Sequence, residues 1–123
     1  MIELITALKG STAIGTFYAS NVIFMPKQYL EDHGVVADEN TEYLSKGVAG
    51  GVIALTVATG LAAFSDNTEA QQIAAKANLA AFAFWGVTGI QKNFFGKAPP
   101  TKGDQIDLGI CTAMLITFGM AMA

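Results

Sequence analysis

The chain has 123 residues, a length that corresponds to one domain. Hydrophobic residues make up 52% of it and charged residues only 14%, compared with about 25% charged residues in typical soluble domains. The net charge of −3 argues against a nucleic acid partner, which would require a basic surface.

All charged side chains lie outside four uncharged stretches of 15 to 19 residues: Gly10–Pro26, Gly47–Ser65, Ala77–Gln91 and Leu108–Ala123. A helix in water carries charged residues along its outer face, whereas a helix in lipid needs an apolar span of about 20 residues. We therefore predict an all-α fold, an integral membrane four-helix bundle that forms a single domain over residues 1–123. A soluble, alanine-rich helical bundle is the alternative.

The first helix is predicted over about residues 3–25, because Pro26 cannot continue the helical hydrogen-bond ladder. An acidic connector follows. Tyr29 and Leu30 within it indicate a short segment that lies on the membrane surface. This connector leads to the second predicted helix.

The second helix is predicted over about residues 41–64, with Asp38 or Asn40 as its N-cap. The third is predicted over about residues 68–95. In the turn before it, Asp66 is followed three residues later by Glu69, a spacing that resembles a capping box. Short connectors between consecutive helices predict two helical hairpins.

The segment Gly96–Pro100 is a stiff connector, and Asp104 with Asp107 marks the start of a fourth helix over about residues 105–122. Five of the seven lysines lie in or beside the first and third connectors. By the positive-inside rule, these connectors face the cytoplasm, stroma or matrix, and both termini lie on the opposite side. Aromatic residues of the same region predict an interfacial belt, with core packing as the alternative for the phenylalanines: Phe24, Tyr29, Tyr43, Phe94 and Phe95.

Small residues recur at helical spacing in all four predicted helices. In lipid, helices associate through close backbone approach, which small residues permit. These positions are therefore predicted to pack against neighbouring helices of the bundle or against a partner subunit. They are Ser11, Gly15 and Ala19 in the first helix, Gly47, Gly51 and Ala54 in the second, Gly86 and Gly89 in the third, and Gly109 and Ala113 in the fourth.

The four uncharged stretches contain no carboxylate, lysine or histidine, so the sequence does not indicate ion or proton transport across a membrane. The only histidine, His33, lies in a connector and is expected to be solvated. A single histidine cannot supply both ligands of a bis-histidine haem. One histidine and one cysteine are too few to form a zinc site, which needs three or four ligands. No catalytic motif is present, and the chain is not expected to be an enzyme.

Three amide side chains, Asn21, Asn78 and Gln91, are the most strongly polar groups inside the uncharged stretches. Asn78 is expected to hydrogen-bond across helices at its own level of the bundle, and its candidate partners are Ser11, Thr12 and Thr59. In the alternative interpretation, an amide oxygen ligates the magnesium of a bound chlorophyll, a hard cation that accepts oxygen ligands. Chlorophyll and carotenoid are the candidate cofactors, although the sequence identifies neither.

Phe24–Met25–Pro26, the acidic linker with Gly34–Val35 and the glycine-rich second helix together resemble the layout of small four-helix membrane proteins of the DoxX-like kind. The expected function is a non-catalytic accessory subunit of a photosynthetic or respiratory membrane complex, with other membrane subunits and lipid as partners. One alternative is a stand-alone membrane protein that handles a small molecule or assists an oxidoreductase through His33, Asp32 and the interfacial aromatics. A thylakoid, inner mitochondrial or bacterial inner membrane fits this sequence equally well.

Overall fold

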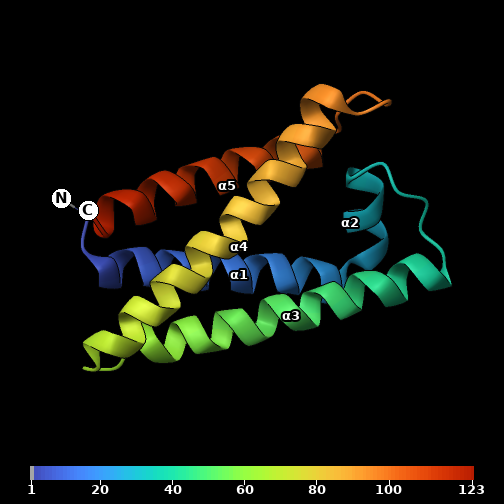
Figure 1. Ribbon diagram of the computed structural model, residues 1–123. Coiled ribbons are helices and arrows are strands. Elements are labelled where there is room, and N and C mark those ends of the chain that lie inside the picture. The colour runs from blue at the N-terminus through green and yellow to red at the C-terminus, as the bar shows by residue number, and fades with distance from the viewer. Residues whose placement is uncertain (1) are drawn as a thin grey trace.

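The computed structural model describes residues 2–123, which form five α-helices and no strand (Figure 1). The helices are α1 (Leu4–Phe24), α2 (Pro26–Asp32), α3 (Glu39–Ala63), α4 (Thr68–Phe95) and α5 (Lys102–Ala121). The predicted all-α class is confirmed. The short helix α2, which was not predicted as a helix, occupies the first half of the first connector.

Pro26 separates α1 from α2 while the chain stays helical on both sides. It occupies the first position of α2, where its missing N–H group interrupts no hydrogen bond. The helix then ends at His33, and Gly34 follows with a φ of +70°, a left-handed conformation that favours glycine. The turn at Gly34 directs the chain toward α3.

Of the two N-caps predicted for α3, Asp38 and Asn40, the first is confirmed. Asp38 is the N-cap, and its side chain forms a reciprocal capping box with Thr41. The helix α4 begins at Thr68, as predicted, but its predicted cap is corrected: Asn67, not Asp66, is the N-cap, and its side chain accepts a hydrogen bond from the backbone N–H of Ala70. The cap thus lies one residue later than predicted and satisfies the N–H of Ala70 rather than that of Glu69.

The predicted start of α5 is also corrected, because the helix begins about one turn earlier than expected. Thr101 is the N-cap, and it exchanges hydrogen bonds with Asp104 in a capping box. Asp104 is therefore the third residue of the helix rather than the residue that precedes it. The Asp104 carboxylate is therefore held in place by the backbone N–H of Thr101.

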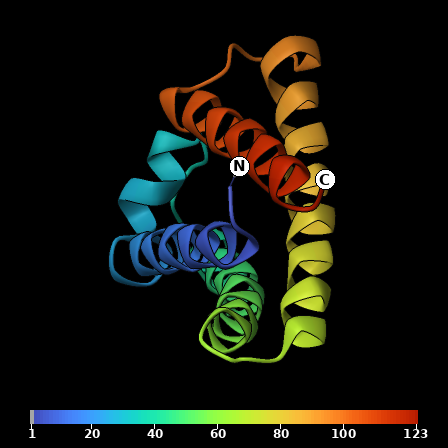
Figure 2. The same ribbon diagram turned by 90° about the vertical axis from the view of Figure 1, so that its left-hand side faces the viewer.

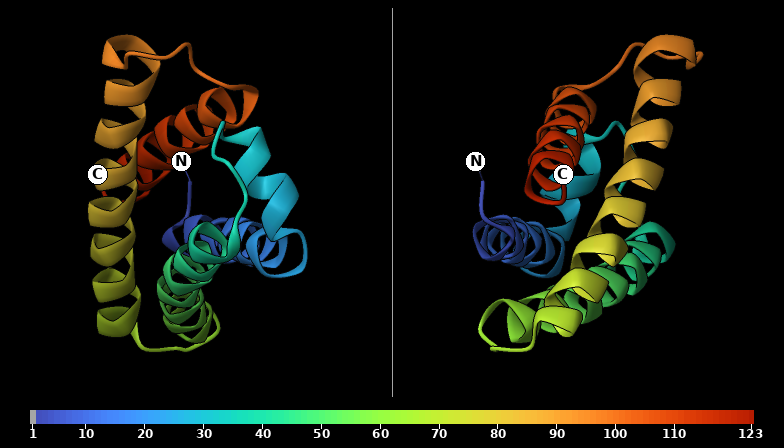
Figure 3. Two further views of the ribbon diagram at one scale, coloured as in Figure 1. Left: turned by 90° about the vertical axis from the view of Figure 1, so that its right-hand side faces the viewer. Right: turned by 60° about the vertical axis from the view of Figure 1, so that its left-hand side comes forward.

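The helices form two hairpins. In one, α1 and α3 lie side by side and antiparallel; in the other, α4 and α5 do (Figure 1). Both termini lie at the same end of the molecule, as the sequence predicts (Figures 1 and 2). The four long helices do not share one axis, because α4 crosses steeply over the direction of α1 and α3 (Figures 2 and 3). This crossing distinguishes the fold from a bundle of near-parallel helices.

The packed core lies toward the end that carries the termini, where short side chains let the helices approach one another. Leu8 and Phe118 are completely buried there, and the Phe118 ring stacks on Phe82 with 6.4 Å between the ring centroids. The buried cluster consists of Ala7, Leu8, Ala62, Ala63, Ala74, Ala75, Phe82, Cys111, Met114 and Phe118. Toward the other end the two hairpins are less tightly packed, and a cavity separates them.

Two of the described helices, α3 and α4, are long and apolar enough to cross a membrane. Large hydrophobic side chains also cover the outside of the molecule: Leu61 is 71% exposed, Phe84 67% and Phe95 81%. Many exposed side chains of this size are typical of a lipid-facing or partner-facing surface. By length and composition two helices could therefore cross a membrane, whereas a crossing by all four long helices is a proposal.

Candidate functional site

A cavity of about 650 Å³ lies between the α1–α3 hairpin and the α4–α5 hairpin. Small-molecule sites in proteins commonly have volumes of about 300–1,000 Å³ and mostly apolar walls. Polar side chains enter this cavity mainly from α2, the end of α4 and the start of α5. The apolar wall includes Ile14, Phe17, Val52, Leu55, Phe82 and Trp85.

Where the cavity meets the packed core, a buried hydrogen-bond network joins three helices. The Asn78 side chain of α4 accepts a hydrogen bond from the Ser11 hydroxyl of α1. It donates to Thr59 Oγ1 of α3 at 2.8 Å and to the Ala74 carbonyl oxygen of its own helix at 2.8 Å. The prediction that Asn78 meets Ser11 or Thr59 at its own level is confirmed. All three side chains of this network are buried, so it fixes one hairpin against the other.

At the opposite end of the cavity, Tyr18 of α1 and Tyr29 of α2 form a hydroxyl pair. The two hydroxyl groups are hydrogen-bonded, and the rings pack edge to face with centroids 5.4 Å apart. Burial is the main reason that the pKa of the Tyr29 phenol is raised, so this hydroxyl stays protonated at neutral pH. The pair therefore acts as a neutral hydrogen-bonding group in the cavity wall.

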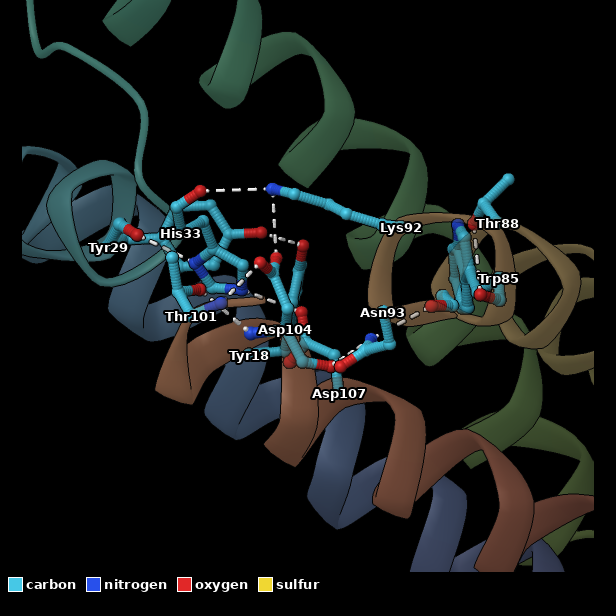
Figure 4. Close-up of polar contacts among 11 residues, drawn as sticks. Tyr18, Tyr29, His33, Trp85, Thr88, Lys92, Asn93, Thr101, Asp104 and Asp107 are labelled. Carbon is cyan, nitrogen blue, oxygen red and sulfur yellow. Dashed lines mark hydrogen bonds and ion pairs between the residues drawn. The ribbon is translucent and has the colours of Figure 1, made fainter. Parts of the chain in front are cut away.

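His33 lies next to this pair, between two hydrogen-bond acceptors (Figure 4). Its Nδ1 is 2.7 Å from the Tyr29 carbonyl oxygen, and its Nε2 is 2.7 Å from Asp107 Oδ2. A neutral imidazole donates from only one nitrogen, so a ring between two acceptors is satisfied when both nitrogens carry protons. The hydrogen bond that His33 donates to the Asp107 carboxylate raises the pKa of His33 above its ordinary 6.5, against the opposing effect of burial. The geometry and the charge both indicate an imidazolium paired with a carboxylate.

This pair predicts a pH-dependent stability. Because the pKa of His33 is raised in the folded chain, its stabilising contribution is complete below the unfolded value near 6.5 and is lost as the pH rises through the folded value. We expect the difference in Tm between the wild type and His33→Gln to shrink as the pH is raised from about 5 to 8. Thermal unfolding in detergent measures this difference. A difference that stays constant across the range would contradict the imidazolium–carboxylate pair.

A second ion pair closes the same end of the cavity. Lys92 Nζ of α4 is 2.9 Å from Asp104 Oδ1 of α5, and it also donates to the His33 carbonyl oxygen at 3.0 Å. Asp104 is only 5% exposed, and its other carboxylate oxygen accepts from the Thr101 N–H at 2.9 Å. Figure 4 shows these contacts around a single point at which α2, α4 and α5 meet.

Close backbone approach brings α2 to α5 at this point. A Cβ atom on Gly103 would lie 2.6 Å from the Asp32 carbonyl oxygen and 3.0 Å from His33 Cε1. Only glycine fits at such distances, because the obstacle is backbone that cannot rotate away. Gly103 in the first turn of α5 therefore allows His33 to reach Asp107.

The three amides that the sequence indicated lie in different surroundings. Asn78 belongs to the buried network and lines the cavity near the core. Asn21 also lines the cavity and is half-buried, and its carboxamide forms no hydrogen bond within residues 2–123. Gln91 is exposed on α4 and is not part of the cavity wall. The structure does not bring the three amides together into one ligand set.

The small residues that were predicted to form packing seams fall into two groups. One group lies at contacts between helices of this chain: Ser11, Gly15, Ala19, Gly86 and Gly89. A Cβ atom on Gly15 would overlap Thr56 Oγ1 of α3, so this glycine permits the close α1–α3 approach. The other group is exposed on the outside of the hairpins: Gly47, Gly51, Ala54, Gly109 and Ala113.

The aromatic residues expected at a membrane interface are also divided. Tyr43, Phe94 and Phe95 are more than two-thirds exposed, at 77%, 71% and 81%. Tyr29, in contrast, faces the cavity, bonded to Tyr18 and packed on the His33 ring with centroids 4.4 Å apart. Its helix, α2, turns inward after Pro26, which the local sequence does not reveal.

The expectation that His33 is a solvated connector residue is wrong. Its partner is not the adjacent Asp32, whose Oδ1 accepts a hydrogen bond from Gln28 at 2.8 Å, but Asp107, 74 residues further along the chain. The spacing of Asp104 and Asp107 on one face of a helix start was visible in the sequence. This spacing indicates more than a helix start, because aspartates three residues apart on a helix also point to the same side.

Within residues 2–123, no group of three or more histidine, cysteine, aspartate or glutamate side chains is arranged to hold a metal ion. Comparison with known protein families, curated proteins and solved structures finds no significant match to this chain. The interpretation of the cavity therefore depends on its own geometry and chemistry.

Proposed function

We propose that this chain is a non-catalytic, membrane-embedded subunit that binds a small, largely apolar molecule between its two helical hairpins. The observation that carries the proposal is the cavity of about 650 Å³, whose apolar wall ends in a group of hydrogen-bonded polar side chains. A cavity of this size with few, localised polar groups is typical of small-molecule binding sites.

The outer surface supports a lipid setting for this site. The helices α3 and α4 are long and apolar enough to span a membrane, and exposed phenylalanine and leucine side chains continue over the rest of the molecule. In the proposed arrangement α1 and α5 complete the bundle, so that a ligand enters the cavity from the bilayer. An apolar molecule reaches such a cavity without passing through water.

The charged groups beside the cavity favour binding over catalysis. Both ring nitrogens of His33 are engaged, one with the Tyr29 carbonyl oxygen and one with Asp107, so neither is free to take a proton from a bound molecule. The Lys92 ammonium is likewise held by Asp104 and a backbone carbonyl group. These groups stabilise one another and close one end of the cavity.

A structural role in a larger membrane complex, photosynthetic or respiratory, is the second candidate. It is favoured by glycines that face outward: no atom lies within 4 Å of a Cβ atom built on Gly47, Gly51 or Gly109. A helix of another subunit can approach such positions closely. The two roles are compatible, because the outward glycines and the cavity occupy different surfaces.

Native mass spectrometry of the chain, purified in nanodiscs from its own membranes, tests the binding function. We expect a bound small molecule, and Thr88→Phe should lower its occupancy about tenfold by placing a ring in the cavity, a change of about 1.4 kcal/mol. The matched control is Thr112→Phe. Both threonine hydroxyls donate to carbonyl groups of their own helices, but only Thr88 lines the cavity.

Equal occupancy in the two variants, or no bound molecule in the wild type, would contradict the binding function. The same preparations show whether other subunits co-purify. Recovery of the chain without any partner would contradict the second candidate, independently of the ligand result.

A further inference from the structure

We infer that the molecule in the cavity is a neutral ring compound that carries a carbonyl oxygen, and that Asn21 donates the hydrogen bond that recognises this oxygen. The inference rests on the proposed function, because it assigns a ligand class to the same cavity. Three features carry it: the unused carboxamide of Asn21, the internal pairing of the charged groups and the aromatic side chains of the wall.

Asn21 lies on α1 one turn after Tyr18, so it faces the polar end of the cavity. Its carboxamide has no hydrogen-bond partner in residues 2–123, whereas the Asn78 carboxamide is engaged with both of its polar atoms. Trp85 also lines the cavity, and its indole N–H has no hydrogen-bond partner in that part of the chain. The Asn21 carboxamide offers both N–H donors and an acceptor oxygen, whereas the Trp85 indole offers a donor only. A ligand acceptor is the one group that can satisfy either residue, and a polar group beside an apolar cavity gains from a ligand that supplies its missing partner.

The charges around the cavity argue for a neutral ligand. Lys92 pairs with Asp104, and His33 pairs with Asp107, so neither cation is free to hold an anion. Asp32, the remaining charged residue of the lining, is exposed and adds a negative charge at the rim. A ligand carboxylate would therefore lose its hydration without gaining a counter-ion, and a ligand ammonium would find no buried, unpaired carboxylate.

Aromatic side chains on both hairpins indicate a ring in the ligand. Phe17 and Tyr18 contribute from α1, and Phe82 and Trp85 from α4, where their rings pack edge to face with centroids 5.9 Å apart. Planar ligands gain from offset-stacked or edge-to-face contacts with such rings. With the ring between the hairpins, a carbonyl substituent is directed toward the end at which Asn21 lies.

Trp85 is the only tryptophan of the chain and lines the cavity, so its fluorescence reports on occupancy. The test uses the full chain in phosphatidylcholine nanodiscs and four probes of matched shape: para-butylacetophenone, para-butylethylbenzene, para-butylbenzoate and para-butylbenzylamine. We expect the ketone to give a saturable change with a Kd about tenfold lower than that of the hydrocarbon, the contribution of one hydrogen bond. The carboxylate and the amine should bind more weakly than the ketone.

Replacing Asn21 with leucine, a side chain of similar size, should remove the tenfold preference for the ketone and leave the affinity for the hydrocarbon unchanged. The matched control is Gln91→Leu, which removes an amide that is exposed on α4 and lies outside the cavity, and which should keep the preference. The ratio of the two affinities is the decisive readout, because a merely structural effect would weaken both probes together.

The inference is overturned if the wild type binds ketone and hydrocarbon equally, if the carboxylate or the amine binds more tightly than the ketone, or if Asn21→Leu retains the preference. It is also overturned if Asn21→Leu loses both probes, since Asn21 then supports the fold. In each of these cases saturable binding by the wild type leaves the proposed function intact. If none of the four probes saturates, the proposed function fails together with the inference.

Discussion

Asn78→Ala is expected to lower the free energy of unfolding by about 2 kcal/mol. The change removes the hydrogen bonds that join α4 to Ser11 on α1 and to Thr59 on α3, and it leaves both hydroxyl groups buried. Interhelical hydrogen bonds in membranes contribute on average about 0.6 kcal/mol each, and the space left by the side chain adds to the loss. Unfolding in detergent, followed by circular dichroism, measures the effect.

The control for this variant is Gln91→Ala, which removes an amide from the same helix. Because Gln91 is exposed, its replacement should change the free energy of unfolding by less than about 0.5 kcal/mol. Similar values for the two variants would mean that the network at Asn78 does not join the hairpins. We also expect Asn78→Ala to reduce ligand occupancy, since the network fixes the spacing of the cavity walls.

Gly103→Ala is expected to destabilise the protein by about 1–3 kcal/mol, the usual cost of forcing an extra methyl group into a closely packed site. The new Cβ atom would lie 2.6 Å from the Asp32 carbonyl oxygen, so α2 and α5 must move apart. Separation of these helices breaks the contact between His33 and Asp107. The loss should appear both in the unfolding free energy and in the NMR signals of the His33 ring.

Gly109→Ala, on the same helix, is the control, and we expect it to change the free energy of unfolding in the opposite direction. No atom lies within 4 Å of a Cβ atom built at this position, so the substitution adds only helix propensity. Alanine is favoured over glycine inside a helix by about 1 kcal/mol, and the variant should be more stable than the wild type. If Gly103→Ala were also neutral or stabilising, the close approach of α2 to α5 would be contradicted.

The four long helices could be predicted from the sequence because their signals are local. Uncharged stretches of helical length, a proline after α1 and polar capping residues before α3 each act through the backbone nearby. Asp38 as the cap of α3 was recognisable for this reason. The predicted cap of α4 and the predicted start of α5 are wrong because several polar residues in succession are each able to cap, as at Asp66 and Asn67, and small differences in turn geometry decide which one does so.

The candidate site was only partly predictable. Asn78 with Ser11 and Thr59 could be anticipated, since polar side chains at one level of a helical bundle must find one another. His33 could not be assigned to Asp107, because the choice of partner depends on α2 turning inward after Pro26 and on Gly103 allowing α5 to lie against it. The difference between Asn21, which faces the cavity, and Gln91, which does not, depends in the same way on the positions of the helix faces.

By itself, the sequence determined the helical class, the number of long helices, the antiparallel hairpins and the shared end for the two termini. These properties follow from hydropathy, helix length and short connectors, which act within one segment or between adjacent segments. Only the tertiary structure decided that α4 crosses the other helices steeply, that a cavity lies between the hairpins and that His33 and Lys92 pair with aspartates of α5 at one end of it. These features arise from side-chain packing between residues far apart in the chain, where the removal of one Cβ atom at Gly103 or Gly15 sets how closely two helices approach.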